Sequence, residues 1–261
     1  MKFLTATLVA IFSTAAVADQ TPQQLQQLVA PIALYPDELV AQVLAASTHP
    51  GDVMQADRWL QQHKNLAADQ LGQQVDQQPW DPSVRALTQF PSVLANLDQN
   101  VSWTSALGGA YATQQQAVLD AVQVMRQRAK DAGTLTSTAQ QTVTNQGQTI
   151  VIEPANPEVV YVPAYDPWTV YGPPLAVYPG WADVFVGPPG ISFGIGLGIG
   201  WFGSYGWGWH HWHADWHEHR AFHEEHGPGR VRGYRAVPRM HAGFRGGFHG
   251  GGFHGGGGHH R

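Results

Sequence analysis

The sequence predicts a mainly α-helical protein of the α+β class: a multi-helix body, a small antiparallel β meander packed on it, and a largely disordered low-complexity tail. Three observations carry this prediction. Apolar residues recur at helical spacing between cap and stop residues over 19–133. Short β-branched runs separated by turn sequences occupy 134–170. Residues 171–261 are rich in Pro, Gly, His and aromatic side chains, a composition that lacks the varied apolar volumes of a packed core.

Residues 1–18 have the pattern of a secretory signal. Lys2 supplies a positive start, an apolar run extends over Phe3–Phe12, and small residues end at Ala18. Such a segment is removed on export, so we expect cleavage near Ala18 and a mature chain that begins at Asp19. The sequence therefore predicts an exported protein of the periplasm or cell envelope.

Composition excludes some classes of site. The chain contains no cysteine, so disulfides, thiol nucleophiles and cysteine-ligated metals are excluded. The formal net charge is −5, yet residues 227–261 hold six arginines and no acidic residue. An acidic body joined to a basic tail is typical of a tail that meets an anionic partner or folds back on the body.

Caps and prolines mark the first helices. Thr21 precedes Pro22, and a glutamine three residues after Thr21 completes the pattern of a capping box. Pro36 restarts the chain before a helix whose first turn carries Asp37 and Glu38, where the helix dipole favours acidic side chains.

Later helices follow the same signals. Asp52 with Gln55 predicts a second capping box, and Asp81 before a proline predicts another start. The longest helix is predicted over 110–132, with Gly133 as its terminator. The apolar positions predicted to face the core of these helices are Leu25, Leu28, Val29, Leu39, Val40, Val43, Leu44, Val53, Ala56, Trp59, Leu60, Leu66, Leu71, Val75, Val84, Leu87, Phe90, Val93, Leu94, Leu97, Tyr111, Val118, Leu119, Val122 and Met125.

The predicted meander comprises three short strands. The runs Thr142–Thr144, Thr149–Ile152 and Val159–Val162 are β-branched or apolar, and turn sequences separate them. So few strands are marginally stable alone, so we expect the meander to pack on the helices.

Four segments resemble one protein family. They are A-P-I-A-L-Y-P-D-E-L-V-A-Q-V-L-A-A-S-T at 30–48, R-W-L at 58–60, Q-P-W-D-P-S-V at 78–84 and I-E-P-A-N-P-E-V-V-Y-V-P-A-Y-D-P at 152–167. In this order they closely resemble the bacterial DUF3300 family, whose members are exported proteins. The resemblance spans about 25–170 and implies an exported, folded body followed by a variable tail. It carries over no activity, substrate or catalytic residue.

Histidines supply the strongest chemical signal, because twelve of the 14 follow residue 209. If residues 207–226 formed a helix, His213 and His217 would lie one turn apart, as would His219 and His223. Imidazoles at that spacing bind Zn²⁺, Cu²⁺ or Ni²⁺, with a nearby carboxylate completing the shell. The alternative is a solvated tail that binds metal adventitiously. The candidate ligands are His210, His211, His213, His217, His219, His223 and His226.

A hydrolase motif is also present. Residues 190–194 match G-x-S-x-G around Ser192, and Asp215 followed by His217 or His219 gives the order of a hydrolase triad. The motif requires a strand before the serine and a helix after it, whereas prolines precede it here and alternating glycines follow. We treat catalysis by Ser192 as the weakest hypothesis.

Residues 191–209 carry no charge and are long enough to cross a bilayer. Their glycines alternate with apolar residues, a period-two pattern that fits a strand better than a membrane helix. Membrane-surface association through this segment and the basic tail is one expectation. Arginines among phenylalanines in the tail also resemble segments that bind single-stranded nucleic acid, but export argues against a nucleic-acid partner.

Three functional hypotheses follow. The leading one is a non-enzymatic envelope protein that binds an envelope component or a protein partner, or acts as a scaffold. The second is a periplasmic transition-metal-binding protein that acts through the tail histidines, and the third is a hydrolase with Ser192 as nucleophile. In the body, Asp37 and Glu38 are explained as first-turn acids, or as a small site with Tyr35 and Trp80.

Overall fold

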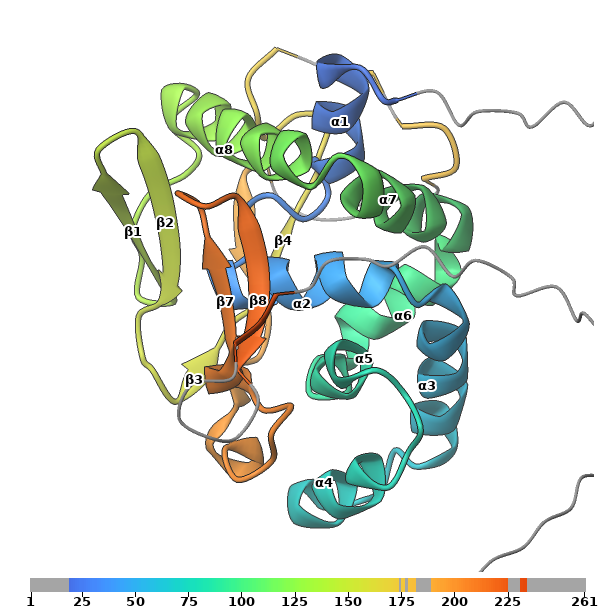
Figure 1. Cartoon of the computed structure of the whole chain (residues 1–261). Coiled ribbons are helices and arrows are strands. Elements are labelled where there is room, and N and C mark those ends of the chain that lie inside the picture. Colours follow the sequence, from blue (N-terminus) through green and yellow to red (C-terminus); the bar gives the residue numbers. More distant parts are fainter. Residues whose placement is uncertain (1–18, 174, 177, 182–188, 225–230, 234–261) are drawn as a thin grey trace, which may run out of the picture.

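The computed structural model describes residues 19–173, 175–176, 178–181, 189–224 and 231–233. The predicted signal at 1–18 lies outside the described residues. Helices dominate the described part, and they are followed by small antiparallel strand pairs (Figure 1). The helices are α1 (Pro22–Val29), α2 (Asp37–Ser47), α3 (Pro50–Gln62), α4 (Ala68–Asp76), α5 (Pro82–Leu87), α6 (Pro91–Gln99), α7 (Val101–Thr113) and α8 (Gln115–Asp131).

The predicted start of α1 is confirmed. Thr21 Oγ1 accepts a hydrogen bond from Gln24 N at 3.3 Å, and Gln24 Oε1 accepts one from Thr21 N at 2.8 Å. The second predicted capping box is wrong. Helix α3 begins at Pro50, and Asp52 accepts a hydrogen bond from the Asp81 amide at 3.1 Å instead of capping its own helix.

The single helix predicted over 110–132 is also wrong, because the chain breaks at Gln114 between α7 and α8. Gln114 has φ −130° and exchanges side-chain hydrogen bonds with the Gln20 backbone at 2.8 and 3.0 Å. This long-range pairing holds the Gln114 side chain at the break, while its amide still donates to the Ala110 carbonyl at 2.7 Å. The predicted terminator is confirmed, since Gly133 adopts φ +73° directly after α8.

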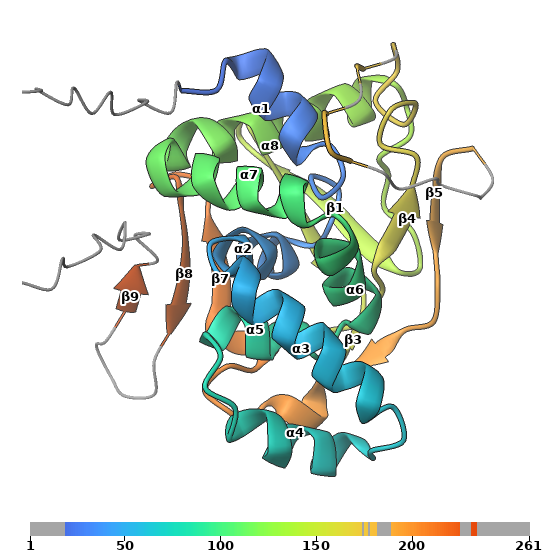
Figure 2. The ribbon, with the colours of Figure 1, turned by 90° about the vertical axis from the view of Figure 1, so that its right-hand side faces the viewer.

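Helix α2 is the centre of the body. Every residue of α2 except Glu38 is buried. Helices α1, α7 and α8 lie on one side of it, and α3, α5 and α6 lie on another (Figures 1 and 2). The predicted apolar positions are buried apart from Trp59, Leu66 and Leu71, which are half-buried. The helical periodicity therefore located the core.

The strands depart from the predicted meander at its third member. The first two form a hairpin as expected, but the third pairs with residues far along the chain instead of continuing it. The pairs are β1 (Gln141–Gln146) with β2 (Thr149–Pro154), β3 (Val159–Val160) with β6 (Leu197–Gly198), and β4 (Pro163–Tyr165) with β5 (Ile191–Phe193); β7 (Trp212–Asp215), β8 (Arg220–Glu224) and β9 (Val231–Gly233) form a three-stranded sheet. All these pairs are antiparallel.

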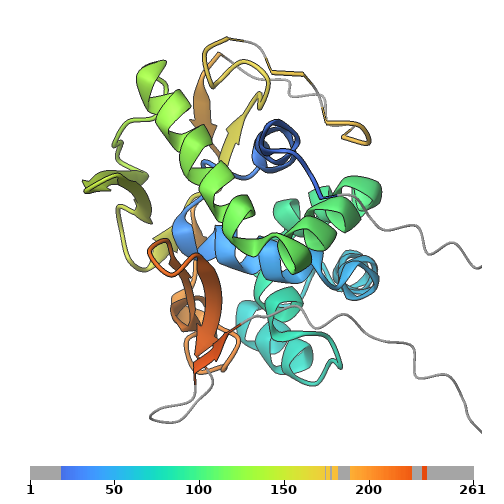
Figure 3. The same ribbon diagram turned by 45° about the horizontal axis from the view of Figure 1, so that its top comes forward.

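Residues 189–224 are folded, which corrects the tail predicted to begin at 171. Ile199, Trp209 and Trp212 lie in the same hydrophobic core as the helices, and Trp212 has no exposed surface. The hairpins β1–β2 and β7–β8 lie on the same side of the body, beside α8 (Figures 1 and 3). The remaining tail, 225–230 and 234–261, lies outside the described residues.

Candidate functional site

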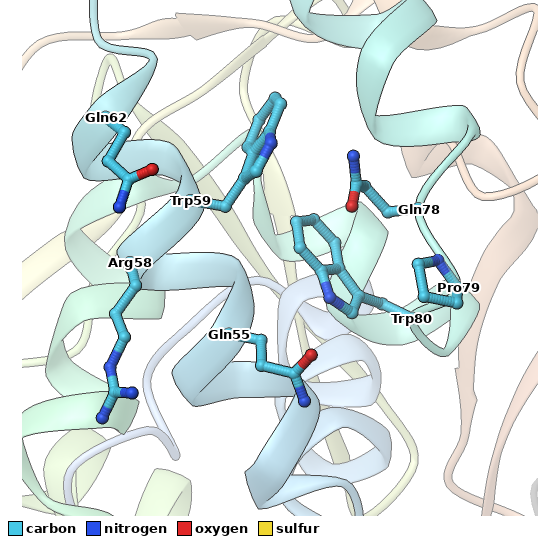
Figure 4. A pocket seen from close by; sticks show the side chains of 7 residues that line it. All are labelled: Gln55, Arg58, Trp59, Gln62, Gln78, Pro79 and Trp80. Atoms are coloured by element: carbon cyan, nitrogen blue, oxygen red, sulfur yellow. The ribbon is translucent and has the colours of Figure 1, made fainter.

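A surface groove lies between α3 and the loop that joins α4 to α5, and we call it the tryptophan groove (Figure 4). It encloses about 350 Å³, a volume within the range of ligand-binding pockets. Figure 2 shows α3 on the outer surface of the body. The groove is lined by Gln55, Arg58, Trp59, Gln62, Gln78, Pro79 and Trp80.

One wall of the groove is a single face of α3. Residues 55, 58, 59 and 62 are three or four positions apart, so their side chains project from the same side of the helix. Residues Val53 and Leu60 face the core from the opposite side and fix that orientation. The other wall is the segment 78–80, which Figure 4 shows across from α3.

The two indole rings are held in defined positions. The ring centroids of Trp59 and Trp80 are 5.8 Å apart, with an interplanar angle of 74°. Trp59 also stacks on the ring of His63 at 4.0 Å, and the His63 Nδ1 atom lies 2.7 Å from the Trp59 carbonyl oxygen. Because Trp80 is only 4% exposed, its ring is anchored in the body. The groove is therefore preformed.

The loop wall is tied to the start of α3. Asp52 accepts the Asp81 amide hydrogen bond at 3.1 Å, and His49 Nε2 lies 3.4 Å from Asp81 Oδ2. Asp81 also caps α5 by accepting from Ser83 N at 2.9 Å. These contacts fix the distance between the two walls without entering the groove.

The polar groups of the groove are three amides and one guanidinium. Gln55, Arg58 and Gln62 are exposed, and Gln78 is half-buried. Within the described part of the chain, Arg58 has no ion-pair partner. None of the seven lining residues is an acid or a histidine, so the lining offers hydrogen bonds and one positive charge but no general acid or base.

The tryptophan groove joins two segments that the sequence left separate. Arg58 and Trp59 belong to the segment 58–60, and the opposite wall belongs to the segment 78–84, both of which carried the family resemblance. Sequence reasoning treated Trp59 as a core position only. The available signal was the spacing of the polar residues 55, 58 and 62 on the same face as Trp59.

A second polar cluster lies around the start of α2. Arg126 of α8 is fully buried and donates from Nη1 to Asp37 Oδ1 at 2.6 Å. Trp216 covers it, with Arg126 Cζ 4.6 Å from the indole centroid and Trp216 Nε1 donating to Asp37 Oδ2 at 2.6 Å. Asp37 also accepts from Ile152 N at 3.1 Å. This cluster joins α2, α8, β2 and the loop after β7, which indicates a structural role.

Glu38, which neighbours Asp37 in this cluster, has a raised pKa. Burial, and then the charges of Asp37 and Glu153, raise the pKa of the Glu38 carboxyl from 4.5 to about 7. Its Oε2 atom is buried without a hydrogen-bond partner among the described residues. Of the residues predicted to form a small site there, Asp37 pairs with Arg126 and the Tyr35 carbonyl accepts from Arg126, whereas Trp80 contacts Trp59 in the tryptophan groove.

Arg126 was missed by sequence reasoning. Its burial could have been predicted from its position, four residues after Val122 and eight after Val118, on the buried stripe of α8. A charged residue at a core position requires a buried partner.

The histidines between 213 and 223 belong to a β hairpin and not to a helix, so the helical pairs of His213 with His217 and His219 with His223 do not form. His223 is buried, with Nε2 hydrogen-bonded to the Gly206 carbonyl oxygen. Among the described residues, no group of three or more His, Asp or Glu side chains is arranged to hold one metal ion.

The remaining candidate ligands are spread over this part of the fold. His219 Nε2 lies 2.9 Å from Asp120 Oδ1, and His213 Nε2 lies 3.8 Å from Glu224 Oε1. His210 and His211 belong to a 3₁₀ turn (Trp209–His211). His226 lies outside the described residues. Metal binding by these histidines stays a prediction.

Ser192 lies within strand β5, and its Oγ donates to the Ala164 carbonyl at 3.1 Å. No helix follows it, as a nucleophile elbow would require. Asp215 pairs with Arg220, at 3.9 Å. Within the described residues, Ser192 therefore has neither the backbone geometry nor a histidine partner of a hydrolase.

The uncharged segment 191–209 forms short strands and 3₁₀ turns (Gly200–Phe202 is the first). Two of its large apolar side chains are exposed, Ile195 at 89% and Trp201 at 69%. In the part of the chain that the structure describes, no helix is both long enough and apolar enough to span a bilayer.

Comparison with known proteins agrees with the resemblance. The family model described as "Protein of unknown function (DUF3300)" matches residues 21–235. The chain is similar to the uncharacterized protein YacH of Escherichia coli (strain K12), with 37% identity over 215 residues that cover 67% of this chain and 35% of YacH. The chain thus spans about a third of the length of that relative. No solved structure was found to match. Because the family model covers most of the chain, the protein belongs to the DUF3300 family.

Proposed function

We propose that the chain is a non-enzymatic binding module of the cell envelope and that the tryptophan groove is its ligand-binding surface. The observation that carries this proposal is a preformed groove that holds two fixed indole rings, three amides and a guanidinium with no ion-pair partner among the described residues. Binding sites combine apolar surface with a few placed polar groups in this way. The lining has no proton-transfer group, which favours binding over catalysis.

The envelope location is part of the proposal. The signal-like segment at 1–18 supports export. A chain without cysteine is compatible with an oxidising compartment. Expression of the full chain and of residues 19–261 in a Gram-negative host tests this directly. The full chain is expected in the periplasmic or membrane fraction, and the shorter chain in the cytoplasm. Equal distribution of both would contradict export.

Cosedimentation with isolated bacterial envelopes tests the groove. The variant combines Gln55→Ala, Arg58→Ala and Gln62→Ala, three exposed positions whose truncation leaves the core intact. We expect purified residues 19–261 to sediment with the envelopes and the variant to bind at least about tenfold more weakly, since a hydrogen bond to a charged group contributes about 1.5–3 kcal/mol.

A matched control removes two amides and one positive charge on α8: Gln116→Ala, Gln127→Ala and Lys130→Ala, all at exposed positions. This control is expected to bind envelopes as the unmodified protein does. The proposal fails if the unmodified protein stays in the supernatant, or if the control loses as much binding as the groove variant.

A further inference from the structure

We propose that the ligand of the tryptophan groove is an anionic carbohydrate polymer, whose sugar rings pack against the exposed part of Trp59 and whose acidic groups pair with Arg58. This inference rests on the proposed function, since it names the ligand class of the same site.

The indoles suit sugar rings. A pyranose ring presents C–H groups on its faces and hydroxyls at its edge, so it is apolar over each face and polar around its rim. The face of an indole carries negative quadrupole density that attracts such C–H groups. Trp59 is half-buried and leaves part of its ring open to a ligand. The buried Trp80 packs against it at 74° and His63 stacks on it, so the Trp59 ring is held in place without a cost of ordering.

The amides suit the rim of a sugar. A hydroxyl both donates and accepts hydrogen bonds, and so does a glutamine amide. Gln55 Nε2 donates to the Gly51 carbonyl at 3.2 Å, and Gln78 Nε2 donates to the Gln74 carbonyl at 3.3 Å. These internal bonds orient both amides, while Gln62 is exposed at the end of α3.

Arg58 selects for negative charge. It is the only charged residue of the lining, it is exposed, and it has no carboxylate partner within the described residues. A guanidinium binds a carboxylate or phosphate through two parallel hydrogen bonds. The surrounding chain is acidic overall, with a formal net charge of −5, so the attraction is local to this side chain.

The openness of the groove favours a polymer that remains intact. Four of its seven lining side chains are exposed, namely Gln55, Arg58, Gln62 and Pro79, so a chain can cross the groove without threading. Hydrolysis of a glycosidic bond typically uses two carboxylates, and the lining provides none. A proline-rich peptide also binds aromatic grooves. Its backbone offers mainly hydrogen-bond acceptors, however, whereas sugar hydroxyls both donate and accept and so use both functions of the glutamine amides.

Titration calorimetry with defined probes tests the ligand class. The probes are polygalacturonate, neutral dextran, polyglutamate and a polyproline peptide, each titrated into purified residues 19–261. We expect polygalacturonate to bind at least about tenfold more tightly than dextran or polyglutamate. Arg58→Gln is expected to remove most of the preference for polygalacturonate over dextran. Trp59→Phe is expected to weaken both polysaccharides, and Lys130→Gln to change nothing.

The outcomes separate this inference from the proposed function. Equal binding of polyglutamate and polygalacturonate, or tighter binding of polyproline, overturns the carbohydrate assignment while leaving a binding groove. Absence of binding to both polysaccharides by a protein that still sediments with envelopes through the groove also overturns it. If the unmodified protein does not sediment with envelopes, the proposed function itself is contradicted.

Discussion

Arg126 of α8 and Asp37 of α2 form a buried ion pair in which Nη1 and Oδ1 are 2.6 Å apart. The guanidinium also donates to the carbonyl oxygens of Ala33, Tyr35 and Ile150 at 2.8–3.0 Å. One side chain therefore connects α8 to the segment before α2, to α2 itself and to β2. The pair places two opposite charges inside the core, where the guanidinium has no exposed surface.

Arg126→Met should be strongly destabilising. It leaves the Asp37 carboxylate buried without its cation and leaves three carbonyl groups without these donors, and breaking a buried pair costs about 3–5 kcal/mol. Urea unfolding followed by circular dichroism measures this free energy. The control is Arg128→Met, because Arg128 makes one exposed hydrogen bond, to the Pro173 carbonyl at 3.3 Å. A similar loss for both variants would contradict the structural role of the pair.

Glu38 should make stability fall as pH rises. In the folded state the pKa of Glu38 is raised to about 7 by burial, compared with 4.5 for an ordinary glutamate. The folded state therefore binds this proton more tightly, so the stabilisation is fully present below pH 4.5 and is lost as pH rises through about 7. Glu38→Gln should then raise stability at pH 8 by at most about 3 kcal/mol.

Urea unfolding of the Glu38→Gln variant at several pH values between 4 and 8 provides the measurement. The gain from the substitution should be largest at the alkaline end and should vanish at the acid end. Glu158→Gln makes the same chemical change at an exposed position and should leave the pH profile unchanged. An equal gain at pH 4 and pH 8 would show that the Glu38 carboxyl is not desolvated.

The sequence predicted most of the helical body because its signals are local. Thr21 and Gln24 form a capping box through neighbours in the chain, and the apolar stripes point to the core through helical periodicity. The break at Gln114 could not be predicted in this way, because its cause is a pairing with Gln20, 94 residues away. Nothing in the local sequence around Gln114 differs from a helix surface.

The candidate site was less predictable than the fold. Trp59 and Trp80 belong to separate helical and loop segments, and only packing brings their rings together.

The folding of 189–224 was missed because glycine-rich composition is typical of disorder, whereas glycine here permits close packing. A Cβ added at Gly208 would lie 2.3 Å from the Phe202 carbonyl oxygen, so this glycine allows the chain to turn back tightly.

Gly108 should tolerate no side chain. Helices α2 and α7 approach so closely that a Cβ at Gly108 would lie 2.0 Å from the Ser47 carbonyl oxygen, a backbone atom that cannot rotate away. Gly108→Ala is therefore expected to lower the free energy of unfolding by more than about 2 kcal/mol, since it forces the helices apart. Unfolding in urea measures the change.

The neighbouring glycine supplies the control for this prediction. A Cβ at Gly109 meets nothing within 4 Å, and the residue lies inside α7. Gly109→Ala should therefore raise stability by about 0.5–1 kcal/mol, through helix propensity alone. If both alanine variants were equally stable, the close crossing of α2 and α7 would be wrong.

Removal of residues 189–224 should unfold the body, although their composition is that of a tail. Ile199 and Trp212 have no exposed surface, and Trp209 is 3% exposed. Burying each large apolar side chain contributes about 1.5–3 kcal/mol, so a chain ending at Gly180 should lose about 5 kcal/mol or more. That loss is comparable to the whole stability of many domains.

A chain ending at Gly233 keeps every described strand pair and should retain the urea midpoint of the full chain. Equal midpoints for the chains ending at Gly180 and Gly233 would show that this segment does not belong to the core.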